Sequence, residues 1–511
     1  MIQPSHASPE VELKFLLSPD EVAAVSATPI FAHKTTHAQL RSVYYDTPDW
    51  DLRRGGVSLR VRLREGVFIQ TVKRQAGLSL FDRDEWESEV NGEDPDPLAW
   101  AGTPVASILT AKGADALGPV FSTTVQRTIR LLDEGACLVE ASLDQGELVA
   151  GKRREPIEEV ELELKAGDAA ALFGVARRLA AAAVLRLSFD SKAERGYRLV
   201  GQNGLTAVTA QAAKIPSDMA AVEGFTQVAR SCLVQVSANA HLLRRVRNPE
   251  VLHELRVGLR RLRAALATFR PIFSRKGRER LKRETKWLAG ELDPARDLDV
   301  FITSTFHSAE ADAHRDPMLA AFGERLLRAQ TMAYDRALAA VDSKRFARLL
   351  LDCAEWVQAA PWQRDDDPAV ARLRDGAVSV LAAQALTRLR RQLRKSGKHL
   401  ATLDPAGRHQ VRIKAKTLRY AGEFFTETFG KRTHKRRRKF IASLQALQNA
   451  LGELSDLATA HRMVLVVVGC SAEVAFRAGQ VVGGRDRDEP QLLATAVQAY
   501  ERWRRARPFW R

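Results

Sequence analysis

Charged residues recur at every second position in four short segments of the N-terminal part. The four sets are Glu10, Glu12 and Lys14; Arg60, Arg62 and Arg64; Glu85, Glu87 and Glu89; and Glu159, Glu161 and Glu163. Successive side chains of a β-strand point to opposite faces, so each set predicts a strand with one charged face. Carboxylates bind Mg²⁺ or Mn²⁺, while Arg and Lys bind phosphate oxygens. These residue types therefore fit metal-assisted chemistry on a phosphate.

A sheet with one apolar and one solvated face is the simpler interpretation, because antiparallel sheets commonly have such faces. Three of the four sets, however, carry a single sign, and their members lie ~7 Å apart and repel one another. A surface selected for solubility would more often intersperse the signs. We therefore expect a closed barrel that turns these faces inward, around a ligand that is both an anion and a metal complex.

Two segments of the C-terminal part carry cationic residues at positions i, i+3, i+7 and i+10. They are His253, Arg256, Arg260 and Arg263, and His409, Arg412, Lys416 and Arg419. On an α-helix these positions fall within an arc of about 80°. For one helix, a solvated charged face is the alternative. The recurrence favours anion binding, because like charges at this spacing destabilise a helix unless they meet an anion.

The elements that must position these residues change near residue 200. Residues 1–200 contain 24 Lys and Arg and 30 Asp and Glu, a charge of −6, and their alternating runs between turn signals predict antiparallel strands. Residues 201–511 carry +23, and their apolar residues at three- and four-residue spacing predict helices. The similarity of Leu288–Asp293 to Leu451–Asp456 indicates a duplication that yields two similar helical bundles.

We therefore predict an α+β multidomain protein. Its domains are residues 1–200, a linker at 201–222, and an all-α domain at 223–511 with halves of about 223–360 and 369–511.

Length and composition limit the class of protein. The chain has 511 residues, a net charge of +17 and 45% hydrophobic residues, which excludes wholesale disorder. Its four cysteines lie far apart and fit a reducing compartment, and the first twenty residues do not resemble a secretory signal. We therefore expect a cytoplasmic protein without a membrane partner. The positive charge alone suggests nucleic acid, an anionic membrane or another polyanion.

The N-terminal motifs resemble those of a known family. Glu10-Val11-Glu12-Leu13-Lys14 is similar to the ExExK signature that opens CYTH domains, the triphosphate tunnel metalloenzymes. The similarity continues in family order over about 190 residues. It includes Tyr45-Asp46-Thr47-Pro48, Leu59-Arg60-Val61-Arg62, Gln70-Thr71-Val72-Lys73, Glu85–Glu89, Leu143-Asp144-Gln145-Gly146, Glu159-Val160-Glu161-Leu162 and Ser191-Lys192.

The resemblance implies an eight-stranded antiparallel β-barrel with flanking helices, open as a tunnel, in which Mg²⁺ or Mn²⁺ assists triphosphate hydrolysis. The implied triphosphate ligands are Lys14, Arg60, Arg62, Lys73, Arg127 and Lys192. The implied metal ligands are Glu10, Glu12, Asp144, Glu159 and Glu161, with Glu85, Glu87 and Glu163 as further candidates. The implied catalytic residues are Lys14, Glu12 and Glu161.

The substrate remains open within this family, whose members act on inorganic triphosphate, thiamine triphosphate or RNA 5′-triphosphates, or as adenylate cyclases. A nucleotide or thiamine substrate requires stacking aromatic residues near the tunnel mouth. Trp50, Phe81 and Trp86 are the candidates, and we expect Trp86 to pack in the core instead.

The C-terminal motifs resemble the CHAD domain, the conserved histidine α-helical domain, over about residues 223–511. The similar segments are His253–Arg263, Arg296-Asp297-Leu298-Asp299 and His409–Tyr420. This resemblance implies binding of long-chain polyphosphate in a basic central groove, by the two cationic sets described above and without catalysis.

The main hypothesis is an inorganic triphosphatase whose helical domain binds polyphosphate and localises the enzyme to it, for example at polyphosphate granules. One alternative is a polyphosphate-binding protein without catalysis, and another is a phosphatase for thiamine triphosphate or nucleoside triphosphates. A third is a nucleic-acid binder, to which the basic segment Lys431–Lys439 would contribute, although no specific nucleic acid is expected. The oligomeric state is open.

Overall fold

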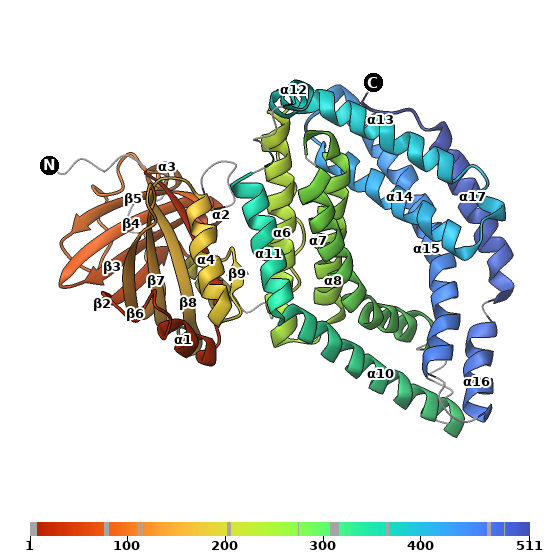
Figure 1. The fold of residues 1–511 in the computed structure, drawn as a ribbon, viewed down its shortest axis with the longest axis horizontal. Coiled ribbons are helices and arrows are strands. Elements are labelled where there is room, and N and C mark those ends of the chain that lie inside the picture. Colours follow the sequence, from red (N-terminus) through yellow and green to blue (C-terminus); the bar gives the residue numbers. More distant parts are fainter. Residues whose placement is uncertain are drawn as a thin grey trace. The chain divides into compact units, whose positions relative to one another are not determined.

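The chain forms two compact units, Met1–Thr206 with Asp342–Ala360, and Ala207–Val341 with Pro361–Arg511 (Figure 1). The computed structural model describes residues 8–75, 81–110, 113, 116–201, 206–273, 275–306, 316–360, 362, 367–467, 472–484 and 486–510.

Within the described residues of the first unit, nine antiparallel strands form one sheet in the order β5-β4-β3-β2-β6-β7-β8-β1-β9. Residues Ser8–Val11 of β1 also pair with β5, so the sheet curves round into a tunnel. The bounds are β1 (Ser8–Leu16), β2 (Thr36–Asp46), β3 (Val57–Arg64), β4 (Val67–Gln75), β5 (Asp82–Val90), β6 (Gly118–Asp133), β7 (Leu138–Ala150), β8 (Arg153–Ala166) and β9 (Arg186–Ser188).

This architecture confirms the predicted fold class, a β tunnel followed by a helical domain, and differs in the number of strands. The sequence motifs predict eight strands. The ninth, β9, pairs with β1 through only three residues, from Lys14↔Ser188 to Leu16↔Arg186. A strand of three residues is too short to show a two-residue periodicity, which explains why the sequence pattern did not reveal it.

Six helices flank the sheet in the described part of the first unit. They are α1 (Pro19–Ser26), α2 (Asp51–Arg54), α3 (Pro104–Leu109), α4 (Ala170–Ala182), α5 (Lys192–Val200) and α11 (Lys344–Gln358). The sequence analysis assigns residues 344–358 to the helical domain, yet α11 belongs to the first unit. It packs against α4, where Arg177 of α4 pairs with Asp352 at 2.8 Å and also with Glu355.

An apolar core lies on the tunnel-facing side of β6, β7 and β8, and α5 packs into it. Leu148 belongs to this core and shares a strand face with Asp144. Ala193 and Tyr197 of α5 are buried there, and an added Cβ on Gly196 would lie 2.2 Å from the Phe121 ring. The packing therefore fixes the position of α5.

The second unit is helical. Its helices are α6 (Ala221–Arg245), α7 (Pro249–Thr268), α8 (Arg275–Phe301), α10 (Pro317–Val341), α12 (Pro368–Asp375), α13 (Val378–Ser396), α14 (Pro405–Phe424), α15 (His434–Val467), α16 (Ala472–Gly483) and α17 (Glu489–Arg505). Both helices that carry the predicted cationic sets begin in the same way. Asn248 caps α7 before Pro249, and Asp404 caps α14 before Pro405. Each cap side chain accepts hydrogen bonds from backbone N–H groups of the first turn, which fixes the start of the helix.

Apolar residues beside the cationic sets on α7 and α14 are buried. Leu252, Leu255, Leu259 and Leu262 of α7 and Val411, Ala415 and Leu418 of α14 all lie in the core.

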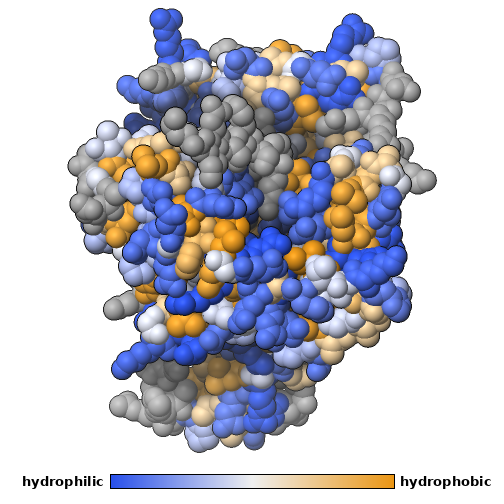
Figure 2. Space-filling view, turned by 90° about the vertical axis from the view of Figure 1, so that its left-hand side faces the viewer, coloured by the Kyte–Doolittle hydropathy of each residue, from blue (hydrophilic) through white to orange (hydrophobic). Residues whose placement is uncertain are grey.

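On the face drawn in Figure 2, hydrophilic residues are interspersed with small apolar patches. Among the helices of the described chain, none combines the length and the apolar character that crossing a membrane requires.

We predict that Gly146→Ala destabilises the first unit. An added Cβ would lie 2.0 Å from the carbonyl oxygen of Thr124 on the neighbouring strand, so the backbone would have to move. We expect a loss of about 2 kcal/mol or more in the free energy of unfolding, measured by urea denaturation.

Gly174→Ala is the matched control in α4, where nothing lies within 4 Å of an added Cβ. It should stabilise the same unit by about 0.5 kcal/mol, because alanine favours a helix over glycine. Equal effects of the two changes would contradict this account of the strand packing.

Candidate functional site

The strand register brings charged residues from separate strands to the face that lines the tunnel. Lys14 of β1 lies opposite Glu161 of β8. Asp144 of β7 lies opposite Glu159 of β8 on one side and Arg127 of β6 on the other. Residues that are up to 147 positions apart in the sequence thus become neighbours, since Lys14 and Glu161 are paired directly.

Three carboxylates form a compact group in the tunnel. Asp144, Glu159 and Glu161 each offer an oxygen atom within 4.8 Å of the others, and all three residues are buried. Hard divalent cations such as Mg²⁺ and Mn²⁺ prefer oxygen ligands. The donor set of this carboxylate group therefore fits such a cation.

Two lysines contact the carboxylate group. Lys192 Nζ lies 2.5 Å from Glu159 Oε1, 2.7 Å from Asp144 Oδ2 and 2.9 Å from Glu161 Oε1. Lys14 Nζ lies 2.8 Å from Glu161 Oε1 and 3.8 Å from Glu159 Oε1. Both lysines are themselves buried. Because a buried charge is costly without a partner, these contacts stabilise both the lysines and the carboxylates.

Arg127 completes the ring of cations and keeps the carboxylates ionised. Its Nε and terminal nitrogen donate to the two oxygens of Asp144 at 2.7 and 2.6 Å, and it also pairs with Glu161. Burial alone would raise the pKa of Asp144, but Lys192 and Arg127 outweigh it and lower that pKa. The pKa of Glu161 likewise lies well below its usual value, because Lys14, Lys192 and Arg127 outweigh burial. Both carboxylates are therefore charged at neutral pH.

The wall formed by β3, β4 and β5 carries the other predicted phosphate ligands. Lys73 Nζ lies 3.0 Å from Glu85 Oε1, and an Arg60 nitrogen lies 3.7 Å from the same oxygen. Arg62 Nε donates to Ser42 Oγ at 3.2 Å. Burial, with Arg60 and Arg127 nearby, lowers the pKa of Arg62 to about 10. This wall thus contains closely spaced cations, and a bound anion would reduce the repulsion between them.

Four predicted carboxylates stand apart from the carboxylate group. Glu12 lies 3.3 Å from Lys14, and Glu87 accepts a hydrogen bond of 3.0 Å from Thr71. Glu85 pairs with Lys73 as described above, and Glu163 pairs with Lys165 at 2.6 Å. The side chain of Glu10 lies outside the described residues.

Arg195 is a site residue that the sequence analysis missed. It is buried, and it donates to Glu159 at 2.8 Å, to Glu155 at 2.9 Å and to the Pro156 carbonyl at 2.6 Å. It follows Lys192 by three residues in α5, so both side chains lie on one face of that helix. Helical spacing applied after Ser191-Lys192 would have found it.

The three candidate stacking aromatics pack against other protein groups. Phe81 is buried and stacks on Phe189 at 5.6 Å between ring centroids. Trp50 packs against Tyr197, with centroids 5.9 Å apart. Trp86 packs against the core of β3 and β4, as expected, and the Arg74 guanidinium lies 5.6 Å from its ring.

In the second unit, the two predicted cationic sets on α7 and α14 lie close together. We call His253, Arg256, Arg260, Arg263, His409, Arg412, Lys416 and Arg419 the cationic cluster. Burial and the neighbouring Arg412, Arg260 and Arg256 lower the pKa of Lys416 to about 6. Burial, Arg296 of α8 and the cations of α7 and α14 lower the pKa of His253 to about 4. The positive charges therefore destabilise one another across the two helices.

Some members of the cationic cluster have partners. Arg256 pairs with Asp293 at 2.6 Å, and Arg419 pairs with Glu423 at 2.6 Å. The absence of a Cβ on Gly452 leaves room for Arg412, whose terminal nitrogen would lie 3.3 Å from that atom. The glycine of the repeated motif thus allows a close approach of the arginine.

The basic segment that the sequence analysis related to nucleic acid begins α15. Lys435, Arg436, Arg438 and Lys439 are exposed there, whereas Arg437 donates to the Thr426 carbonyl at 2.7 Å. Its role in binding nucleic acid stays a prediction.

Comparison with known families gives two matches along the chain. Residues 8–197 match the CYTH domain, and residues 227–465 match the CHAD domain.

Two individual proteins are informative relatives. A protein of Haemophilus influenzae named inorganic triphosphatase is 31% identical over 209 residues, which cover 39% of this chain and 56% of that protein. The chain thus matches little more than half of that relative's length. The crystal structure of the CHAD domain from the plant Ricinus communis is 27% identical, with a TM-score of 0.50, and covers 58% of this chain and 97% of that chain.

We predict that Lys192→Met strongly destabilises the first unit. The substitution removes a buried cation that contacts all three members of the carboxylate group. We expect a loss of about 3 kcal/mol in the free energy of unfolding near neutral pH, measured by urea denaturation. Lys165→Met is the control, because Lys165 pairs with Glu163 at a more exposed place, and it should cost less than about 1 kcal/mol. Similar losses for both variants would refute the role given to the buried pairs.

Proposed function

This chain carries a CYTH domain followed by a CHAD domain, and on that premise we propose that it is a divalent-metal-dependent inorganic triphosphatase with a polyphosphate-binding helical domain. The single observation that carries the proposal is the buried carboxylate group of Asp144, Glu159 and Glu161 in contact with Lys14, Lys192 and Arg127. The similarity to an inorganic triphosphatase of Haemophilus influenzae supports the same activity.

The cations of the tunnel bind the phosphate oxygens. Lys14, Arg127 and Lys192 are held by carboxylates in the free protein, and Arg60, Arg62 and Lys73 extend the positive wall. Triphosphate brings oxygens of the same charge as the carboxylates, so the cations exchange one anionic partner for another. The exchange leaves the carboxylates available for a cation of higher charge.

Glu10, Glu12, Asp144, Glu159 and Glu161 are the residues proposed to hold Mg²⁺ or Mn²⁺ or to position the attacking water. A divalent ion held by these carboxylates would supply positive charge to the phosphate oxygens during in-line attack by water. Arg195 acts as a positioning residue, because its contacts with Glu159 and Glu155 hold Glu159 in the carboxylate group.

Lys14, Glu12 and Glu161 are the proposed catalytic residues. Lys14 stabilises the charge that develops on the terminal phosphate. Glu12 lies beside Lys14 but outside the carboxylate group, where it orients the attacking water and accepts its proton. The water oxygen forms the new bond to phosphorus while the phosphoanhydride bond breaks, which yields phosphate and diphosphate. Glu161 contacts both Lys14 and Lys192 and holds them in register.

Inorganic triphosphate fits this tunnel better than a substrate with an aromatic group. Phe81, Trp50 and Trp86, the three stacking candidates, are engaged in packing within the protein. A thiamine or nucleotide ring would thus not find these residues available. This observation favours the inorganic substrate over thiamine triphosphate and nucleoside triphosphates.

The cationic cluster is the proposed site for long-chain polyphosphate. It brings cations from α7 and α14 together, and burial together with the neighbouring positive charges lowers the pKa values of His253 and Lys416. Polyphosphate carries negative charges along its length and, unlike nucleic acid, has no bases that a protein must recognise. Arg and Lys therefore suffice to bind it. Bound polyphosphate would also localise the enzyme, for example to cytoplasmic polyphosphate granules.

We expect purified protein with Mg²⁺ or Mn²⁺ to release phosphate from inorganic triphosphate, and more slowly from thiamine triphosphate and ATP. The double variant Lys14→Ala, Glu12→Ala should lose at least about a hundredfold in kcat, because it lacks a phosphate ligand and the group that orients water. A colorimetric phosphate assay measures all three substrates.

Arg41→Ala is a control for this assay, since Arg41 is half exposed and pairs with Glu93. It should leave the rate unchanged. Phosphate release at equal rates by the double variant and the wild type would overturn the enzyme proposal and leave a protein that only captures anions.

We also predict that polyphosphate binding takes up protons. Lys416 has a pKa of about 6 in the free protein, and bound phosphates raise that pKa. Affinity is therefore greatest below about pH 6 and falls as the pH rises toward the pKa of the bound state. Titration calorimetry in two buffers of different ionisation enthalpy measures the uptake at mildly alkaline pH. Lys416→Met should remove part of it.

Lys414→Met is the matched control on the same helix, because Lys414 contacts Ser396 rather than the cationic cluster. Its proton uptake should equal that of the wild type. A nucleic-acid function would be favoured instead if long-chain polyphosphate failed to compete with DNA at equal phosphate concentration near physiological salt.

A further inference from the structure

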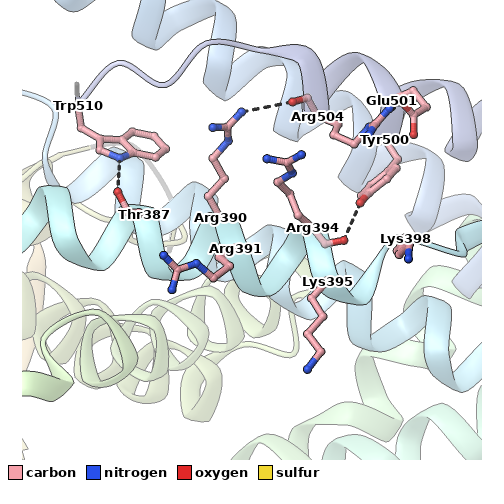
Figure 3. Close-up of a pocket in the computed structure, with 10 residues that line it drawn as sticks. All are labelled: Thr387, Arg390, Arg391, Arg394, Lys395, Lys398, Tyr500, Glu501, Arg504 and Trp510. Atoms are coloured by element: carbon pink, nitrogen blue, oxygen red, sulfur yellow. Dashed lines mark hydrogen bonds and ion pairs between the residues drawn. The ribbon is translucent and has the colours of Figure 1, made fainter.

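A pocket of about 460 Å³ lies between α13 and α17 in the second unit (Figure 3). Its lining is strongly cationic and includes no member of the cationic cluster. The ten residues are Thr387, Arg390, Arg391, Arg394, Lys395, Lys398, Tyr500, Glu501, Arg504 and Trp510. Glu501 is the one acidic residue among these ten, against six cationic ones.

The pocket carries an excess of positive charge. Glu501 pairs with Arg504 at 2.7 Å, so its negative charge is balanced by a residue of the same helix, α17. Arg390 and Arg394 are four residues apart on α13, which places like charges side by side, and Lys398 follows just beyond the end of the helix. Figure 3 shows Arg390 and Arg394 projecting from α13 toward α17, whereas Lys395 projects away from it. Positive charge is thus concentrated in the space between the two helices.

Hydrogen bonds fasten the walls of the pocket to each other. Tyr500 of α17 donates its hydroxyl to the Arg394 carbonyl at 2.9 Å, and Trp510 Nε1 donates to Thr387 Oγ1 at 3.0 Å. Arg390 donates to the Ala506 carbonyl at 3.0 Å. The pocket is therefore built into the packing of α13 against the C-terminal segment.

The aromatic residues of the pocket do not form a platform for a base. Trp510 is 6% exposed and packs edge-to-face against Phe440, with centroids 5.1 Å apart. Tyr500 is buried and packs against Trp503. The groups that remain accessible are guanidinium and ammonium groups, which recognise oxyanions.

The helix dipole explains only part of this charge. Cations near the C-terminal end of a helix are favoured, which accounts for Arg394 and Lys395 in the last turn of α13. The dipole also favours Arg504, which lies in the last turn of α17, but it does not explain Arg390, which lies earlier in α13. An oxyanion in the pocket would offset the excess of positive charge among these residues.

We propose that this pocket is a second oxyanion site, which binds phosphate groups of a polyphosphate chain independently of the cationic cluster. The inference rests on the proposed function, because it assigns another site to the same ligand. A chain held at two places on the helical unit dissociates more slowly than one held at a single place.

The test uses the full-length protein and compares two double variants with the same loss of charge. Arg394→Gln, Lys398→Gln changes the pocket, and Arg502→Gln, Arg505→Gln changes exposed residues of α17 that do not line it. Arg390 is left intact, because it fastens the C-terminal segment. Affinity for long-chain polyphosphate is measured by titration at several salt concentrations, and thermal unfolding checks that both variants fold.

The pocket variant should bind long-chain polyphosphate about tenfold more weakly, with a shallower salt dependence, while the control changes about twofold or less. Adding Lys416→Met and Arg412→Gln should leave residual binding that the pocket changes then remove. Equal affinities of the pocket and control variants, with polyphosphate still bound, would overturn this inference and leave the proposed function intact. A loss specific to single-stranded DNA would also overturn it. Failure of the wild type to bind polyphosphate would refute both.

Discussion

The ion pairs inside the tunnel are the interaction on which the first unit depends. Asp144, Glu159 and Glu161 are buried, and a buried carboxylate without a partner would be too costly to remain ionised. Lys14, Lys192 and Arg127 supply the partners from β1, α5 and β6, three elements far apart in the sequence. The sheet must therefore curve until these strands meet, and α5 must pack against its inner face. The apolar contacts of Ala193 and Tyr197 provide that packing and so place Lys192.

The helical unit treats its charges in the opposite way. The tunnel pairs its cations internally with carboxylates, whereas in the cationic cluster burial, together with neighbouring cations of α7 and α14, lowers the pKa of Lys416 to about 6. The folded unit therefore holds fewer protons than the unfolded chain between pH 6 and the usual lysine pKa. Its stability consequently rises with pH in that range. A polyanion removes the same cost when it binds.

The alternation of charges in the strands predicted the tunnel-lining face well, because a two-residue period survives in any strand long enough to show it. Lys14 and Glu161, which belong to two of the stripes, lie opposite each other, and Asp144, which the family resemblance implied, lies beside Glu161. The pattern could not show which stripe residues share an ion, since Glu163 lies on the same face as Glu161 and yet pairs with Lys165. Arg195 was missed because it belongs to a helix, whose period differs from that of the strands. The membership of α11 in the first unit had no local signal, because it depends on tertiary packing such as the contact between Arg177 and Asp352.

The two parts of the chain carry net charges of opposite sign, in line with their different arrangements of charged residues. Residues 1–200 carry −6, and under the proposed function their carboxylates would meet a divalent cation as well as the lysines and arginines of the tunnel. Residues 201–511 carry +23 because their cations, on α7 and α14 and around the pocket between α13 and α17, outnumber the carboxylates beside them. Under the proposed function, the first unit would bind a small cation with a short anion, and the second an anion that extends over several groups of cations. The length of the phosphate chain would then distinguish the ligands of the two units.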